Sequence, residues 1–269
     1  MSVLSKSDII AKVESGASLA DASLSKLDLY AIAIPEADLS EADLTKVTLT
    51  NADLRRVNLS GANLENADLR GANLEGANLT GANLTGAYVT RANIKGANFS
   101  DANLTHIKLQ LTVYDQATQF PGDFRYKSSG AVGPGAVLNG AYLNTANLRG
   151  LDLTGAKFIG TYLSGADFTG ATLEDVSFSG ANLQKAFFTG ANLQNARFSN
   201  AELKGVDFRA ADLSGVDLSA VANIAGADFT QAKGLDDQSR ASLLTKFPAG
   251  DLTTWNDYTR SNTKQSLDV

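Results

Sequence analysis

Residues 61–85 read G-A-N-L-E-N-A-D-L-R-G-A-N-L-E-G-A-N-L-T-G-A-N-L-T. The stretch repeats every five residues, with a small, a polar and a large apolar residue in that order. We call the large apolar residue of each repeat its centre. Working outward, the centres continue without a slip from Leu19 to Leu109. A second block begins at Leu138 and ends, after a slip of one residue, at Phe229, which gives 38 repeats in all.

A period of five matches neither the 3.6 residues per turn of a helix nor the two-residue alternation of a strand. It fits a coil with flat sides, each one repeat long. The centre and the small residue two positions before it then point inward, and the chain winds as a solenoid.

The second block also indicates how many sides each coil has, because its centres alternate between Phe and Leu from Phe158 to Leu213. An even number of sides keeps like residues stacked in successive coils. With four sides, two facing walls carry Phe and the other two carry Leu, which fills a narrow interior at native density. The predicted core stacks are Phe158, Phe178 and Phe198 on one wall, and Phe168, Phe188 and Phe208 on the opposite wall.

Two polar positions of the repeat have structural roles. Asn or Asp commonly precedes the centre, where such side chains hydrogen-bond to turn backbone and to each other in stacked ladders. Gly often stands two residues after the centre, as at Gly81, and permits a corner with positive φ.

The tandem A-(N/D)-L-X-X over 17–109 and 136–229 resembles the pentapeptide-repeat family. The resemblance implies an all-β solenoid, the right-handed quadrilateral β-helix of that family. The stretch Y-D-x-x-T-x-F-P-x-x-F after the first block resembles an insertion loop of cyanobacterial members. Known relatives include a regulator of heterocyst differentiation that binds a transcription factor, and DNA-mimicking proteins that protect or inhibit DNA gyrase.

We expect caps at both ends, because an open coil exposes unpaired strand edges. Residues 1–16 form a helical N-terminal cap, with Ser7 and Asp8 as its N-cap and Gly16 at its end. The two repeat blocks occupy 17–109 and 138–230. Residues 231–269 form a helical cap, from Asp236-Asp237 to Phe247, followed by a mobile tail in which Trp255 docks on the last coil.

Residues 110–137 interrupt the repeat with two Pro and four Gly, and we interpret them as an insertion loop. A loop of this length is usually functional or disordered, and its aromatic residues favour order. We expect it to pack against the outside of the solenoid. The alternative is a hinge between two separate solenoids.

Composition excludes several classes of function. The chain has no Cys and a single His, so it lacks the residues of a zinc site or a disulfide scaffold. A net charge of −6 argues against direct nucleic-acid binding. No apolar stretch is long enough to span a membrane, and the charged N-terminus is unlike a signal peptide, which predicts a cytoplasmic protein. His106, at an outward corner, is interpreted as a lone surface histidine, and we expect neither enzymatic activity nor a cofactor.

The sequence therefore favours a non-catalytic scaffold, regulatory in a cyanobacterium, that binds an as yet unidentified protein partner, with a monomer favoured over a dimer. The alternative is a DNA-mimicking modulator of gyrase, although each block nets only −3. Tyr142 and Tyr162 have two interpretations: they contact a protein partner, or they shield the insertion loop. The candidate partner surface consists of Tyr114, Phe120, Phe124, Tyr126, Tyr142, Tyr162 and Phe187.

Overall fold

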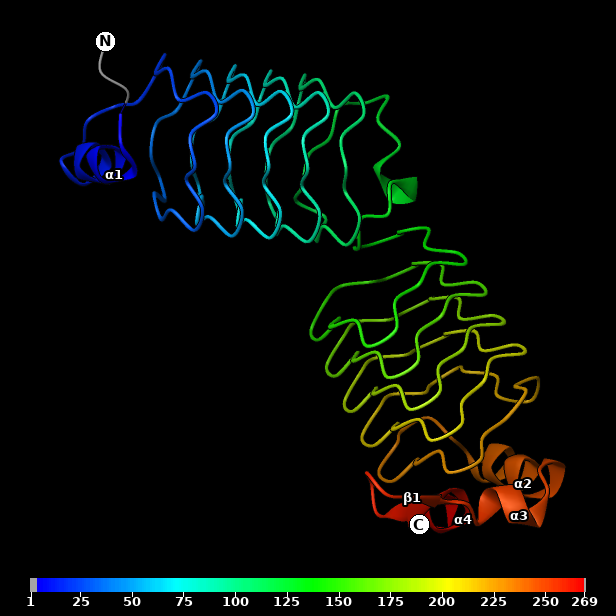
Figure 1. Cartoon of the computed structure of the whole chain (residues 1–269). Coiled ribbons are helices and arrows are strands. Elements are labelled where there is room, and N and C mark those ends of the chain that lie inside the picture. The colour runs from blue at the N-terminus through cyan, green and yellow to red at the C-terminus, as the bar shows by residue number, and fades with distance from the viewer. Residues whose placement is uncertain (1–3, 269) are drawn as a thin grey trace. The chain divides into compact units, whose positions relative to one another are not determined.

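Each five-residue repeat forms one side of a four-sided coil. The computed structural model describes residues 4–268, in two compact units that divide between Val132 and Gly133. In unit 1, parallel β-bridges join residues 20 positions apart, from Ser23 with Asp43 onward, and in unit 2 they run from Val137 with Lys157. Four five-residue sides per turn account for this spacing. Within each unit the coils lie one above another (Figure 1).

The interior of both units is filled by the centres and by the small residues before them, nearly all of which are buried. In unit 2 the predicted phenylalanine stacks are present. The rings of Phe158 and Phe178 lie 5.2 Å apart and tilted by only 10°, and those of Phe168 and Phe188 lie 4.8 Å apart and 2°. The two stacks meet edge to face across the coil, as in the 5.9 Å contact between Phe158 and Phe168.

The repeat tolerates a one-residue insertion without losing the wall. Phe208 stacks on Phe229 at 5.3 Å, although 21 residues separate them, and Glu202 pairs with Asn223 across the same slip. The extra residue is absorbed between walls, as in a β-bulge.

The corners use left-handed backbone whether or not they carry glycine. Gly81 has φ 68°. Residues with side chains at the equivalent position also have positive φ, such as Asn66 at 55° and Leu111 at 59°. The predicted positive φ is therefore a property of the corner, and glycine is the residue that adopts it without steric cost.

A short helix covers the N-terminal end of unit 1. Helix α1 spans Lys6–Glu14, and its N-cap is Ser5, which forms a reciprocal capping box with Asp8. The prediction of Ser7 and Asp8 as the cap was two residues too late, because Asp8 is the third helical residue of that box. Ile9 of this helix is fully buried, and the helix lies beside the first coil (Figure 1).

Four short helices and strands beyond α2 complete unit 2. Helix α2 spans Asp237–Lys246 after the N-cap Asp236, as the sequence indicates. The segment beyond it is folded, so the predicted mobile tail was wrong. Its elements are α3 (Ala249–Leu252), β1 (Trp255–Asn256), β2 (Ser261–Asn262) and α4 (Thr263–Leu267), and β1 pairs with β2 in antiparallel register.

The tail is held on the last coils by hydrogen bonds to their backbone. Asn256 Nδ2 donates to the carbonyl of Gly226 at 2.9 Å, and Thr263 Oγ1 donates to the carbonyl of Ile224 at 2.9 Å. Trp255 remains 53% exposed. The anchor of β1 is therefore the side chain of Asn256, and not the predicted indole.

Residues 110–132 complete the last coil of unit 1. Val113 bridges to Asn93 and to Val132, and Gln119 bridges to Asn98, so two walls continue through this segment. The ring of Phe120 stacks on the core residue Phe99 at 5.7 Å and 7°. The prediction that the loop packs on the outside of the solenoid was therefore wrong, because its aromatic residues cover the open end of the coil. The 3-10 helix η1 (Tyr126–Ser128) belongs to this cover.

Candidate interaction surfaces

The most exposed pair of aromatic rings lies on one wall of unit 2. Tyr142 and Tyr162 are neighbours in the bridge ladder, and their rings stack face to face at 4.7 Å with an angle of 5°. Tyr142 is 79% exposed and Tyr162 43%. Both rings are therefore open to solvent on this wall.

An aliphatic side chain extends this surface. Ile159 occupies the corner that leads into Tyr162 and is 43% exposed, and its amide donates to Asn139 Oδ1 at 3.1 Å. We call Tyr142, Tyr162 and Ile159 the tyrosine wall. Farther along the same ladder the residues become polar, first Asn182 and then Glu202.

The aromatic residues of the 110–132 segment form a closed cluster. Tyr114 is buried, with 3% exposure, and its ring meets Phe120 and Tyr126 edge to face. Phe120 stacks on Tyr126 at 4.4 Å and contacts Phe124 at 5.8 Å. Tyr114 is therefore part of the interior. Phe120, Phe124 and Tyr126 are half-buried, and the ring of Phe120 packs against the other two.

Phe187 is partly covered by the C-terminal segment. Tyr258 contacts its ring at 4.8 Å, and Arg209 lies over the other ring of this pair at 5.9 Å from the Tyr258 centroid. The guanidinium of Arg209 also makes a bidentate pair with Asp207, which is 1% exposed. Phe187, Tyr258, Arg209 and Asp207 together hold the C-terminal segment on the wall, and we call them the tail clamp.

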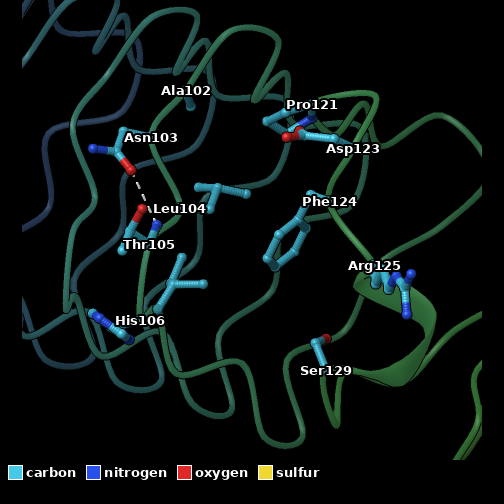
Figure 2. A pocket seen from close by; sticks show the side chains of 11 residues that line it. Ala102, Asn103, Leu104, Thr105, His106, Pro121, Asp123, Phe124, Arg125 and Ser129 are labelled. Carbon is cyan, nitrogen blue, oxygen red and sulfur yellow. Dashed lines mark hydrogen bonds between the residues drawn. The ribbon is translucent and has the colours of Figure 1, made fainter.

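A recess of about 540 Å³ lies at the end of unit 1, where the chain leaves the coil. Figure 2 shows Leu104 and Phe124 on its two sides, with Asp123 toward the Ala102 end. His106 lies at an exposed corner with φ 58°, as predicted for a surface histidine. The lining comprises Ala102 to Ile107, Pro121, Asp123 to Arg125, and Ser129.

The carboxylates do not gather on one wall. In unit 1 the bridge ladders place Asp38, Asp43, Asp53 and Asp68 on four different walls. Several acids are paired with arginine, since Arg55 contacts Asp53 at 2.7 Å and Arg70 contacts Asp68 at 2.6 Å. An acidic stripe of the kind that imitates a duplex would need unpaired carboxylates in a row.

Arginine also shapes the acids of unit 2. Arg149 donates to Asp167 at 2.8 Å. Partial burial opposes ionisation of Asp167, but hydrogen bonds from Thr169 and Arg149 outweigh it and lower the pKa of this carboxyl. The ionised form is thus held in place as part of the wall.

Two further kinds of site, a metal centre and a membrane-spanning helix, have no counterpart in residues 4–268. In that range, no group of three or more His, Cys, Asp or Glu side chains is arranged to hold a metal ion. Helices long and apolar enough to cross a bilayer are likewise absent from the part of the chain that the structure describes.

Sequence reasoning missed three features of these surfaces. The pairing of Tyr258 with Phe187 joins a residue of the repeat to a distant residue outside it, and leaves no periodic signal. Ile159 could have been found as the large apolar residue at a corner position that is otherwise polar. The recess could have been anticipated from the 21-residue spacing of Phe99 and Phe120, which places 121–129 beyond the wall above Leu104.

Comparison with known proteins agrees with the repeat. The family model of pentapeptide repeats matches in eight copies, over 37–76, 72–110, 135–170, 171–209, 186–219 and 201–233. These ranges cover more than half of the chain. No curated protein sequence matches it.

Solved structures of pentapeptide-repeat proteins are similar to the chain. HetL from the cyanobacterium Nostoc sp. strain PCC 7120, described as involved in heterocyst differentiation regulation, is 25% identical over 86% of this chain and 98% of its own, with a TM-score of 0.36. Rfr23 from the cyanobacterium Cyanothece 51142 is 43% identical over 35% and 63%, with a TM-score of 0.34. Full-length QnrB1, a plasmid-mediated fluoroquinolone resistance protein, is 21% identical over 81% and 98%, with a TM-score of 0.27.

Proposed function

Because the chain belongs to the pentapeptide-repeat family, with its right-handed quadrilateral β-helix, we propose that it is a non-catalytic scaffold for protein–protein interaction. The tyrosine wall of unit 2 is its contact surface. The observation that carries the proposal is the stacked and exposed pair of Tyr142 and Tyr162. Aromatic side chains are enriched at the centres of protein interfaces, where they contribute most of the binding energy.

The support beneath these rings favours binding. Both tyrosines stand on backbone that is fixed by hydrogen bonds, since the amide of Leu143 donates to the carbonyl of Tyr162 at 2.8 Å. Each ring is further restrained by the other. A partner therefore meets side chains that lose little conformational freedom on binding.

A double substitution tests the proposal. In a pull-down from native lysate, Tyr142→Ala/Tyr162→Ala should lose a partner that the unchanged chain recovers. Tyr88→Ala is the matched control, because Tyr88 also precedes a centre and is 48% exposed, but it stands alone on its wall in unit 1. Recovery of every partner by the double variant, with its thermal unfolding unchanged, would contradict the proposal.

Gyrase modulation by charge mimicry is the rival function. The spread of the acids over four walls and their pairing with arginine favour the scaffold. A supercoiling assay separates the two functions. The scaffold predicts no change in gyrase activity at micromolar protein and low salt, and inhibition or protection there would favour the rival.

A further inference from the structure

The last coil of unit 1 has an unpaired edge on one wall. In every earlier coil of this wall, the backbone pairs with the coil that follows. The amide of Leu84 donates to the carbonyl of Asn103 at 2.9 Å, and the amide of Gly86 donates to the carbonyl of Thr105 at 2.9 Å. One coil later, the amides of Leu104 and His106 have no hydrogen-bond partner within residues 4–268.

The acceptor of the same rung is also open. The amide of Asn103 donates to the carbonyl of Ala82 at 2.9 Å, but among the described residues nothing donates to the carbonyl of Ala102. The chain cannot fill the rung itself. It follows the neighbouring wall at Gln119 and the opposite wall at Val132, and between them it bulges away to form the recess of Figure 2.

The covering of the recess is incomplete as well. Leu104 is 7% exposed and Ala102 8%, whereas the equivalent residues one coil earlier, Leu84 and Ala82, are fully buried. The opposite side of the recess is formed by Phe124. An apolar side chain set between Leu104 and Phe124 would therefore complete the wall.

We propose that this edge binds an extended segment of a protein partner, which adds one parallel rung to the wall. Addition of a strand to an open sheet edge is a common mode of peptide recognition. The chain's own repeat defines the segment: a small residue over Ala102, any residue next, and an apolar residue over Leu104.

Charge complementarity sets the flanking residues. A parallel segment enters at the Ala102 end, where Asp123 and Asp101 line an adjoining recess, and leaves toward His106 and Arg125 (Figure 2). A basic residue before the small residue and an acidic residue after the apolar one therefore fit this edge. The hexapeptide K-A-N-L-T-E, blocked at both ends, meets all these requirements.

The repeat also specifies each hydrogen bond. By analogy with the preceding coil, the peptide Asn amide donates to Ala102, and its carbonyl accepts from the amide of Leu104. The peptide Thr carbonyl accepts from the amide of His106. Three backbone bonds align the segment, and this surface is independent of the tyrosine wall.

Hydrogen exchange followed by NMR tests the proposal on the full chain. Without peptide, the amides of Leu104 and His106 should exchange much faster than those of Leu84 and Gly86. Adding the peptide at millimolar concentration should protect the first pair selectively. Methylation of the peptide Asn nitrogen should weaken binding about tenfold, which corresponds to the loss of one hydrogen bond. The charge-reversed peptide E-A-N-L-T-K should also bind more weakly.

Variants of the protein add a second readout. Thr105→Trp places a large side chain in the recess and should abolish binding, whereas Thr45→Trp, at the same corner three coils earlier, should not. Slow exchange of Leu104 and His106 in the free protein would overturn the proposal. So would protection that rises with protein concentration alone, equal binding of the methylated and unmethylated peptides, or no binding at millimolar peptide.

Discussion

At the scale of single residues, the corner of each repeat decides which substitutions the chain tolerates. The corner needs φ near +60°, where the Cβ atom of any residue other than glycine lies too close to the following carbonyl oxygen, which has a steric cost. Natural corners such as Asn66 and Leu111 carry that cost already. The coil is therefore stable despite its corners, and glycine corners are its least strained.

Two glycines give a matched test of corner strain. Gly81 has φ 68° and Gly122 does not have positive φ, while a Cβ added at either would meet no atom within 4 Å. We expect Gly81→Ala to lower the free energy of unfolding by about 1 kcal/mol. Gly122→Ala should leave it unchanged or raise it slightly, because alanine restricts the unfolded chain. Urea unfolding measures both, and equal destabilisation would contradict the corner account.

The polar ladder makes a second prediction at this scale. Hydrogen bonds from Ser18 and Ser40 lower the pKa of Asp38 from 3.8 to about 2. Because the pKa of Asp38 is lower in the folded chain than in the unfolded chain, the ionised carboxylate stabilises the fold at pH values above the unfolded-chain pKa. This contribution is lost as pH falls through about 2. We expect an NMR titration to give that low pKa, and Ser18→Ala to raise it toward 3.8. A pKa near 3.8 in the unchanged chain would refute this ladder.

At the scale of elements, the ends of the two units show what a repeat cannot encode. The coil walls were predictable, because every fifth side chain must be buried, and the alternation of Phe with Leu indicated an even number of sides. Four sides agreed with the packing of the core and with the resemblance to the family. The tail was not predictable. Asn256 reaches the carbonyl of Gly226 and Tyr258 reaches Phe187 without any sequence period to reveal those contacts.

The cap of α1 lies between these cases. The sequence S-x-x-D at Ser5 to Asp8 carries the capping-box signal, and the helix begins where that signal places it. The covering role of Phe120 was also readable in principle, since it lies 21 residues after Phe99, as Phe229 does after Phe208.

The tail clamp of Phe187, Tyr258, Arg209 and Asp207 gives a prediction at this scale. Arg209 pairs with the buried Asp207, and Arg55 makes the same bidentate pair with the more exposed Asp53. Arg209→Ala leaves a buried carboxylate without its cation, so it should lower the free energy of unfolding by about 2 kcal/mol. Arg55→Ala should have little effect, because water solvates the freed carboxylate. Chemical unfolding compares them, and equal losses would be inconsistent with the clamp.

At the scale of the whole molecule, the fold supplies regular walls on which surface residues stand in rows. The sequence indicated surface aromatics as contact residues, but only the structure separates exposed rings from covered ones. Tyr142 and Tyr162 stand free on their wall, whereas Tyr114 is interior and Phe187 is partly covered. Burial in a loop or under a tail depends on contacts that the five-residue period does not specify.

The central claim is that four five-residue sides close each coil, and pairs of spin labels test it most directly. The chain contains no Cys, so introduced cysteines are labelled specifically. Thr80 and Ser100 lie at one corner of successive coils, whereas Thr90 lies half a coil from Thr80. The coil predicts strong dipolar broadening for labels at 80 and 100, about one strand spacing of ~4.8 Å apart in the backbone, and weak broadening for labels at 80 and 90. Coupling at 80 and 90 equal to or stronger than that at 80 and 100 would contradict the four-sided coil.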